Sequence, residues 1–199
     1  MKIKICGLSR REDVAYVNQT RPDWCGFVID CPKSRRNVSG EQAAALRAEL
    51  APGIVPVGVF VDRPVDQVAG LLLDGTIAVA QLHGGEDEGY LAALRDAAPG
   101  CVLWRAFRVR SREDLVSAAA SSADLVVLDN GAGTGQVFDW SLLKGFPRPY
   151  LLAGGLTPDN LPQAAALGPF GVDLSSGVET EKKKDRHKIE AAVAAARKE

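Results

Sequence analysis

The sequence contains few of the residues from which metal and disulfide sites are built. It has only two histidines, and its four cysteines, at positions 6, 25, 31 and 101, form no Cys-x-x-Cys pair. Zinc sites need closely spaced Cys and His ligands, so none is expected here. We therefore expect no metal and no cofactor, and we expect the thiols to be reduced, as in a cytosolic protein.

Long hydrophobic runs and blocks of one charge are also absent. The amino-terminal residues contain no apolar run of signal-peptide length, and no stretch is long enough for a membrane span. The net charge is -1, and the first basic block is 182–184. Membrane and nucleic-acid partners are therefore not expected. We predict a cytoplasmic protein whose partner is a small molecule.

The chain is long enough to form one large hydrophobic core. Its 199 residues are 46% hydrophobic and 25% charged, which are ordinary globular values. A chain of this length buries most of its apolar surface without a metal or disulfide. No linker-like segment divides it, so we predict a single domain over residues 1–199.

Strand and helix patterns alternate along the whole chain. The apolar runs predict strands at 1–6, 24–29, 57–61, 77–82, 101–106, 124–129, 150–153 and 171–174. The intervening segments predict helices at 9–19, 41–50, 65–73, 86–97, 111–120, 140–144, from 157 onwards and at 185–197. Residues 30–38 and the glycine-rich segment 130–136 are predicted loops.

Three of these boundaries depend on particular residues. Ser9 with Glu12 has the form of a capping box at the start of the first helix. Pro56 cannot donate a ladder hydrogen bond, so we place it just before the third strand. Thr157 is the expected N-cap of a helix whose first residue is Pro158.

Eight strand-then-helix units predict a parallel α/β fold, because continuously apolar strands are buried on both faces. Eight units are the number that closes into a (β/α)8 TIM barrel. The alternative is an open doubly wound sheet, but the turn after the first strand lacks the Gly-x-Gly-x-x-Gly pattern. We therefore expect the barrel.

In such a barrel the active site lies on the loops that follow the strands. Cys6 ends the first strand, although a buried cysteine that acts as a small hydrophobe is the simpler interpretation of this residue alone. Asp129 ends the sixth strand, across the barrel from Cys6, and the two could give and take a proton. His83 follows the fourth strand.

The loops after the last two strands favour an anion. Gly154-Gly155 and Ser175-Ser176-Gly177 can bring backbone N–H groups close to a phosphate without a Cβ in the way. Each could be an ordinary turn, but they occupy the paired positions of the usual barrel phosphate site. We predict a phosphorylated substrate.

At these residues the sequence resembles the phosphoribosylanthranilate isomerase family of tryptophan biosynthesis. The matching segments run in order along the chain: 4–8, 26–28, 32–36, 57–61, 81–84, 128–129, 133–135, 138–140, 153–156 and 172–179. The resemblance implies an Amadori rearrangement of N-(5'-phosphoribosyl)anthranilate to the corresponding 1-deoxyribulose 5-phosphate.

The resemblance also implies the role of each residue. Cys6 is the general base at C2', and Asp129 is the general acid at the ribose ring oxygen. The remaining positions bind the phosphosugar substrate: Arg36 the anthranilate carboxylate, Asp173 the ribose hydroxyls, His83 the pocket wall, and Gly155, Ser176 and Gly177 the phosphate. The loop pattern adds Gly154 and Ser175 to the predicted phosphate site. The loop after the second strand departs from the family pattern by one extra residue, which leaves Arg35 as an alternative to Arg36.

The two proton-transfer roles place demands on the site. An unperturbed thiol is only about 3% thiolate at pH 7, which costs roughly 2 kcal/mol, so we expect an environment that favours the Cys6 thiolate. Asp129 must be protonated to act as the acid, and a dry site near an anionic substrate favours that form.

Other functions fit the sequence less well. The related isomerase of histidine biosynthesis uses an aspartate as base on the first strand and a bis-phosphorylated substrate, whereas Cys6 and one phosphate site are found here. A metal-dependent ribulose-phosphate epimerase would need more histidines, and a non-catalytic phosphosugar-binding barrel would leave Cys6 and Asp129 unexplained. No feature demands a dimer, so we favour a monomer over a homodimer.

Overall fold

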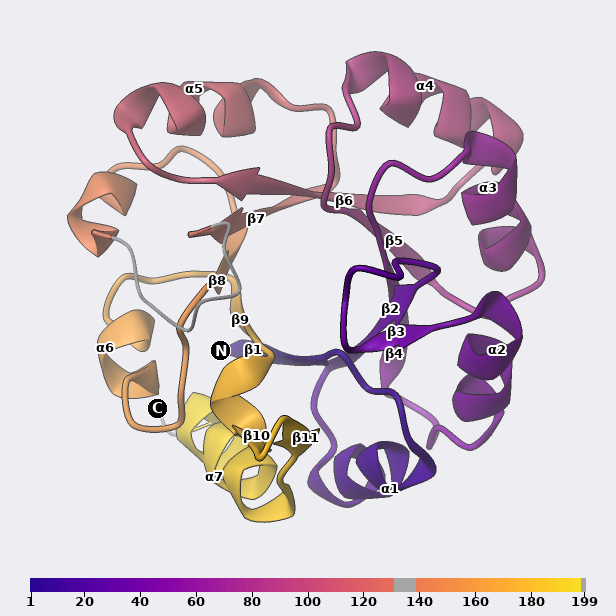
Figure 1. Ribbon diagram of the computed structural model, residues 1–199. Coiled ribbons are helices and arrows are strands. Elements are labelled where there is room, and N and C mark those ends of the chain that lie inside the picture. The colour runs from indigo at the N-terminus through magenta and orange to yellow at the C-terminus, as the bar shows by residue number, and fades with distance from the viewer. Residues whose placement is uncertain (131–138, 198–199) are drawn as a thin grey trace.

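The computed structural model describes residues 1–130 and 139–197 and shows a closed barrel of parallel strands (Figure 1). The barrel strands are β1 (Lys2–Cys6), β2 (Trp24–Ile29), β4 (Val55–Phe60), β5 (Val79–Leu82), β6 (Val102–Arg108), β7 (Leu125–Asp129), β8 (Tyr150–Ala153) and β9 (Gly171–Leu174). β1 pairs in parallel with both β2 and β9, which closes the sheet. The predicted (β/α)8 barrel is confirmed.

Helices surround the strands in an outer ring (Figure 1). They are α1 (Arg11–Thr20), α2 (Gly40–Ala48), α3 (Val65–Leu73), α4 (Glu88–Ala97), α5 (Arg112–Ala120), α6 (Leu161–Ala165) and α7 (Arg186–Arg197). Between β7 and β8 the described residues hold only a 3-10 helix, η1 (Trp140–Leu143). None of the helices in the described ranges has the length and apolar character needed to cross a bilayer.

The apolar side chains form two layers because successive strand residues point to opposite faces of the sheet. The larger layer lies between strands and helices and includes Ile3 and Ile5 of β1. A smaller cluster fills the barrel interior: Val57, Val79, Trp104, Leu125, Val127, Leu151 and Ala153. The inner layer therefore supports the floor of any site at the strand ends.

Three predicted helix starts are wrong. Helix α4 begins at Glu88 rather than at residue 86, after the N-cap Asp87, whose side chain accepts a hydrogen bond from the Tyr90 N–H at 2.9 Å. Helix α1 begins at Arg11, and the Asp13 carboxylate, not Glu12, accepts hydrogen bonds from the Ser9 and Arg10 backbone at 3.0 and 3.1 Å. Helix α6 begins at Leu161 rather than Pro158, so Thr157 is not its N-cap.

The late start of α6 has a local cause. The Asn160 Oδ1 accepts a hydrogen bond from the Thr157 N–H at 2.9 Å, and its amide nitrogen donates to the Gly155 carbonyl at 3.0 Å. These bonds hold residues 157–160 as a turn, which competes with the helix.

Pro56 lies inside a strand, contrary to expectation. It pairs with Cys25 of β2 within β4, and its carbonyl accepts a hydrogen bond from the Ala78 N–H at 2.9 Å. Proline has no N–H, so the ladder has one hydrogen-bond donor fewer at this second residue of the strand. One missing donor near a strand end is tolerated.

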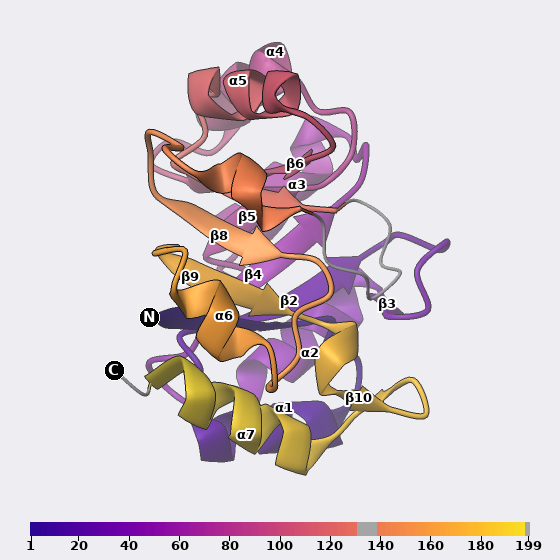
Figure 2. The same cartoon turned by 90° about the vertical axis from the view of Figure 1, so that its left-hand side faces the viewer.

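Several short elements at the carboxyl end of the barrel were not predicted. They are the strand β3 (Asn37–Val38), the 3-10 helix η2 (Ser176–Val178), and the hairpin of β10 (Glu179–Thr180) and β11 (Lys183–Lys184). Figure 2 shows the loop at β3 and the hairpin at β10 projecting on the side toward which the β8 and β9 arrows point. The predicted loop at 130–136 falls, from residue 131 onwards, outside the described residues.

Candidate active site

A cavity of about 200 Å³ opens at the carboxyl ends of the barrel strands. Its lining residues include Cys6, Arg36, Gln81, His83, Asp129, Gly154, Gly155, Asp173, Ser175 and Ser176. The structure therefore gathers at one place residues that are up to 170 positions apart in the chain (Cys6 to Ser176). Among the residues predicted for the site, only Gly177 does not line this cavity.

Cys6 lies at the end of β1 with its side chain inside the barrel and is 8% exposed. The neighbouring strand leaves space for it because residue 26 is glycine. A Cβ at Gly26 would lie 2.8 Å from the Cys6 sulfur and 3.1 Å from the Lys4 Nζ. Gly26 thus gives both side chains room at the same point of the barrel interior.

The expected preference of Cys6 for the thiolate is not found in the structure. Burial raises the pKa of the Cys6 thiol, and the nearby Asp173 carboxylate acts in the same direction. The Lys4 ammonium opposes them but does not prevail. The Lys4 cation does stand beside the sulfur, yet loss of hydration and the Asp173 carboxylate together outweigh it.

Lys4 is a buried charged side chain beside the cavity that the sequence analysis did not single out. It is fully buried, and its ammonium donates hydrogen bonds to Asp173 Oδ2 at 2.7 Å and Gln81 Oε1 at 2.8 Å. Burial works against its charge, but the Asp173 carboxylate, together with the interaction with Cys6, prevails and raises the pKa of Lys4. The lysine is held as a cation inside the barrel.

Asp129 ends β7 and is 9% exposed. Its Oδ2 lies 3.4 Å from His83 Nε2, which follows β5. Gly154 makes room for it: a Cβ there would lie 2.4 Å from Asp129 Oδ1, and the φ of Gly154 is +87°. The carboxyl group therefore depends on glycine at this turn for both space and backbone shape.

The two glycine-containing turns that were predicted to bind phosphate lie against each other. A Cβ at Gly177 would lie 1.8 Å from the Leu156 carbonyl oxygen, so the loops after β8 and β9 are in direct contact there. Ser175 Oγ donates to the Cys6 carbonyl at 3.1 Å, which ties the second loop to β1. Gly177 thus brings the two loops together.

Arg36 enters the cavity from the loop after β2, and Arg35 does not line it. Its guanidinium pairs with the buried Glu179 of β10, with Nε 2.6 Å from Oε1 and Nη2 3.0 Å from Oε2. Glu179 also accepts hydrogen bonds from Lys184, at 2.7 Å, and from Arg35. Although burial opposes ionisation, these cations lower the pKa of Glu179 to about 2.

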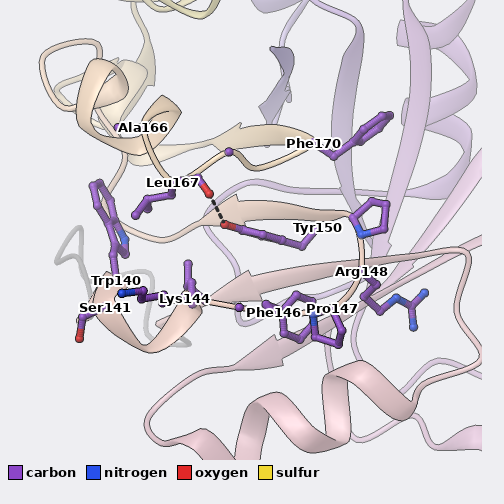
Figure 3. A pocket seen from close by; sticks show the side chains of 14 residues that line it. Trp140, Ser141, Lys144, Phe146, Pro147, Arg148, Tyr150, Ala166, Leu167 and Phe170 are labelled. Atoms are coloured by element: carbon purple, nitrogen blue, oxygen red, sulfur yellow. Dashed lines mark hydrogen bonds between the residues drawn. The ribbon is translucent and has the colours of Figure 1, made fainter.

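A larger cavity, of about 790 Å³, lies elsewhere (Figure 3). Figure 3 shows Trp140, Tyr150 and Phe170 around it, and the Tyr150 hydroxyl donates to the Leu167 carbonyl at 3.5 Å. Tyr150 begins β8 and Phe170 precedes β9, so this cavity is at the amino ends of the strands. It contains none of the predicted site residues. Within the described ranges no cluster of His, Cys, Asp and Glu could hold a metal ion.

A closed (β/α)8 barrel with a thiol, a carboxyl group and an arginine around one cavity at its strand ends defines a barrel enzyme of acid–base chemistry. The family model for N-(5'-phosphoribosyl)anthranilate isomerase matches residues 3–195. The chain belongs to this family of tryptophan-biosynthesis isomerases.

Individual relatives agree over nearly the full length. The chain is 45% identical to the N-(5'-phosphoribosyl)anthranilate isomerase of Endomicrobium trichonymphae, over 94% of each chain. It is 32% identical to the dimeric isomerase of Thermotoga maritima, crystallised as monomers, with a TM-score of 0.86 and 98% of each chain covered. An isomerase in complex with reduced 1-(o-carboxyphenylamino)-1-deoxyribulose 5-phosphate is 30% identical, with the same TM-score and coverage.

Proposed function

We propose that this chain converts N-(5'-phosphoribosyl)anthranilate to 1-(2-carboxyphenylamino)-1-deoxy-D-ribulose 5-phosphate by an Amadori rearrangement. The observation that carries the proposal is that Cys6, Asp129, Arg36 and Asp173 line the same cavity as the turn at Gly154. The ligand of the related isomerase complex is a reduced form of this product, which supports the same chemistry here.

In the first step Asp129 acts as general acid. It gives its proton to the ribose ring oxygen, the bond between that oxygen and C1' breaks, and the anthranilate nitrogen becomes a protonated Schiff base. Asp129 can act here because it is nearly enclosed and projects into the cavity. The carboxylate that remains stays within 3.4 Å of His83 Nε2.

In the second step Cys6 acts as general base. The C2'–H bond breaks, its electron pair forms the double bond between C1' and C2', and the proton moves to the sulfur of Cys6 in its thiolate form, which becomes the thiol. The positive Schiff-base nitrogen accepts the displaced electron pair and becomes neutral. The resulting enolamine tautomerises to the ketone product.

The remaining cavity residues bind the substrate. Asp173 Oδ1 is buried and has no hydrogen-bond partner among the described residues, so it is ready to accept from a ribose hydroxyl. Arg36 binds the anthranilate carboxylate, and the loops containing Gly154, Gly155, Ser175, Ser176 and Gly177 bind the phosphate. His83 forms part of the wall near Asp129.

The decisive experiment follows the loss of anthranilate-riboside fluorescence with purified protein. We expect turnover of N-(5'-phosphoribosyl)anthranilate and no turnover of the bis-phosphorylated substrate of the histidine-pathway isomerase. Folded protein, verified by circular dichroism, that turns over neither compound would leave only a binding role and refute the proposal.

We further propose a monomer that works in the cytoplasm. The four cysteines are free, as the proposed Cys6 chemistry requires. The exposed large apolar residues of the described chain are spread over several elements: Val61, Leu73, Val102, Val116, Leu167 and Phe170. Sedimentation equilibrium should give the mass of one chain, about 21 kDa; a stable dimer mass would contradict this.

A further inference from the structure

We propose that Lys4 is the positioning residue for proton transfer at Cys6, with its ammonium donating a hydrogen bond to the sulfur and stabilising the thiolate. The inference rests on the proposed function, because it assigns a helper to the base of that reaction. Lys4 itself stays protonated and does not touch the substrate.

The geometry supports this role through the number of donors on a lysine. An ammonium group has three N–H donors. Two of them are used by Asp173 Oδ2 and Gln81 Oε1, at 2.7 and 2.8 Å. The Cys6 sulfur and the Lys4 Nζ are neighbours, because they lie 2.8 and 3.1 Å from the position that a Cβ at Gly26 would occupy. The third donor is the one that the proposal assigns to the sulfur.

The position of Lys4 also suits a charge that forms only during the reaction. Lys4 is fully buried, so its attraction to a thiolate is little screened by water. Burial raises the pKa of the Cys6 thiol, and Asp173, which pairs with the lysine, acts in the same direction, so Cys6 is a thiol at neutral pH. When the thiol loses its proton to water, the ammonium is the nearest partner for the new negative charge.

Substrate binding strengthens this effect through Asp173. A ribose hydroxyl that donates to Asp173 Oδ1 disperses the carboxylate charge that opposes the thiolate. The Lys4 ammonium then stabilises the Cys6 thiolate more strongly. The base thus becomes active when the site is filled, because the same carboxylate contacts both the lysine and the substrate.

Other charged groups surround Cys6 and have to be considered in any pH measurement. Asp173 on β9 acts against the thiolate, and Lys184 on β11 acts for it. The other titratable groups that line the cavity are Arg36, His83 and Asp129. Only Lys4 combines complete burial with a position next to the sulfur.

The test measures the alkylation rate of Cys6 by iodoacetamide against pH, using mass spectrometry of the Cys6 peptide and no substrate. Lys4→Met should move the alkylation profile to higher pH and slow the reaction at neutral pH by about tenfold or more. In the same variant kcat should fall by about 100-fold or more, with a smaller change in KM.

Lys2→Met is the matched control. It makes the same substitution on the same strand, but Lys2 is 54% exposed and pairs with Asp23 at the surface. Its alkylation profile and kcat should equal those of the wild type. A profile of Lys4→Met that coincides with that of Lys2→Met would overturn the proposal, whatever happens to kcat.

A second pair of variants covers the case in which Lys4→Met fails to fold around an unpaired Asp173. Asp173→Asn alone should move the alkylation profile to lower pH, and adding Lys4→Met to it should move the profile back to higher pH. No difference between these two variants would also overturn the proposal. Because none of these alkylations needs substrate, they stay informative even if the wild type fails to turn over the proposed substrate.

Discussion

Arg36 and Glu179 form a two-pronged ion pair that joins the loop after β2 to the hairpin after β9, with N–O distances of 2.6 and 3.0 Å. The Glu179 side chain is 5% exposed, and the Arg36 side chain is 17% exposed. The pair holds the guanidinium at the wall of the cavity rather than in solvent. The loop after β2 and the hairpin after β9 are therefore tied together across the top of the barrel.

Removal of this carboxylate should weaken both the fold and substrate binding. Glu179→Gln leaves Arg36 and the buried Lys184 without their common counter-charge, which costs about 3 kcal/mol of unfolding free energy. KM should rise because Arg36 loses its fixed direction. Glu190→Gln is the control, since this exposed carboxylate pairs with Arg186 on α7 and should contribute at most about 0.5 kcal/mol. Equal urea midpoints for the two variants would refute the prediction.

The same carboxylate should make the protein sensitive to acid. The pKa of Glu179 is about 2 in the fold, below the ordinary value of 4.5. The contribution of Glu179 to the free energy of unfolding is therefore fully present above pH 4.5. It is lost as the pH falls toward 2, by roughly 3 kcal/mol at most. Urea unfolding at a series of pH values should show a steeper acid loss for the wild type than for Glu179→Gln. Parallel curves would be inconsistent with a lowered pKa.

Asp129→Asn should separate catalysis from binding. The amide keeps the size of the side chain but cannot give the proton, so kcat should fall by about a thousandfold while the dissociation constant of a reduced product analogue changes little. Asp139→Asn is the control, because Asp139 caps η1 on the same β7–β8 segment and does not line the cavity. An unchanged kcat in Asp129→Asn would remove this residue from the mechanism.

Gly154→Ala should damage the site through Asp129. Both Gly154 and Gly145 have positive φ angles, +87° and +79°, but only at Gly154 would a Cβ meet another group, at 2.4 Å from Asp129 Oδ1. Alanine at Gly145 should cost about 1 kcal/mol of stability and leave kcat unchanged. Alanine at Gly154 should lower stability further and reduce kcat. Identical kinetics for the two variants would show that Gly154 matters only for the backbone.

Much of the fold followed from local patterns. Continuous apolar runs separated by helical segments predicted eight parallel strands, and β8 and β9 have the predicted ends. Errors arose where a side chain made an unforeseen bond, as Asp13 and Asn160 did at helix starts. The hairpin of β10 and β11 was missed because its strands have only two residues each.

The candidate site was predictable wherever residue type and strand position agreed. Cys6 and Asp129 end predicted strands and the turn at Gly154 follows one, and barrel closure brings such positions to one end. The pairing of Arg36 with Glu179 could not be foreseen, because 143 residues separate them and no local pattern connects them. The prediction that Cys6 favours its thiolate was wrong for a related reason. The pKa of Cys6 depends on its burial and on the nearby Lys4 and Asp173, and only the tertiary structure shows how these effects combine.

The sequence by itself determined that Cys6 ends a strand and that this strand belongs to a parallel barrel. It could not show what surrounds the thiol, because the alternation of Lys2, Ile3, Lys4 and Ile5 is typical of a strand with one face in water. Only barrel closure makes the second face an interior as well, and it brings Gln81 and Asp173 to Lys4 from 77 and 169 residues away. A buried charge needs partners, and tertiary structure alone decided which residues they are.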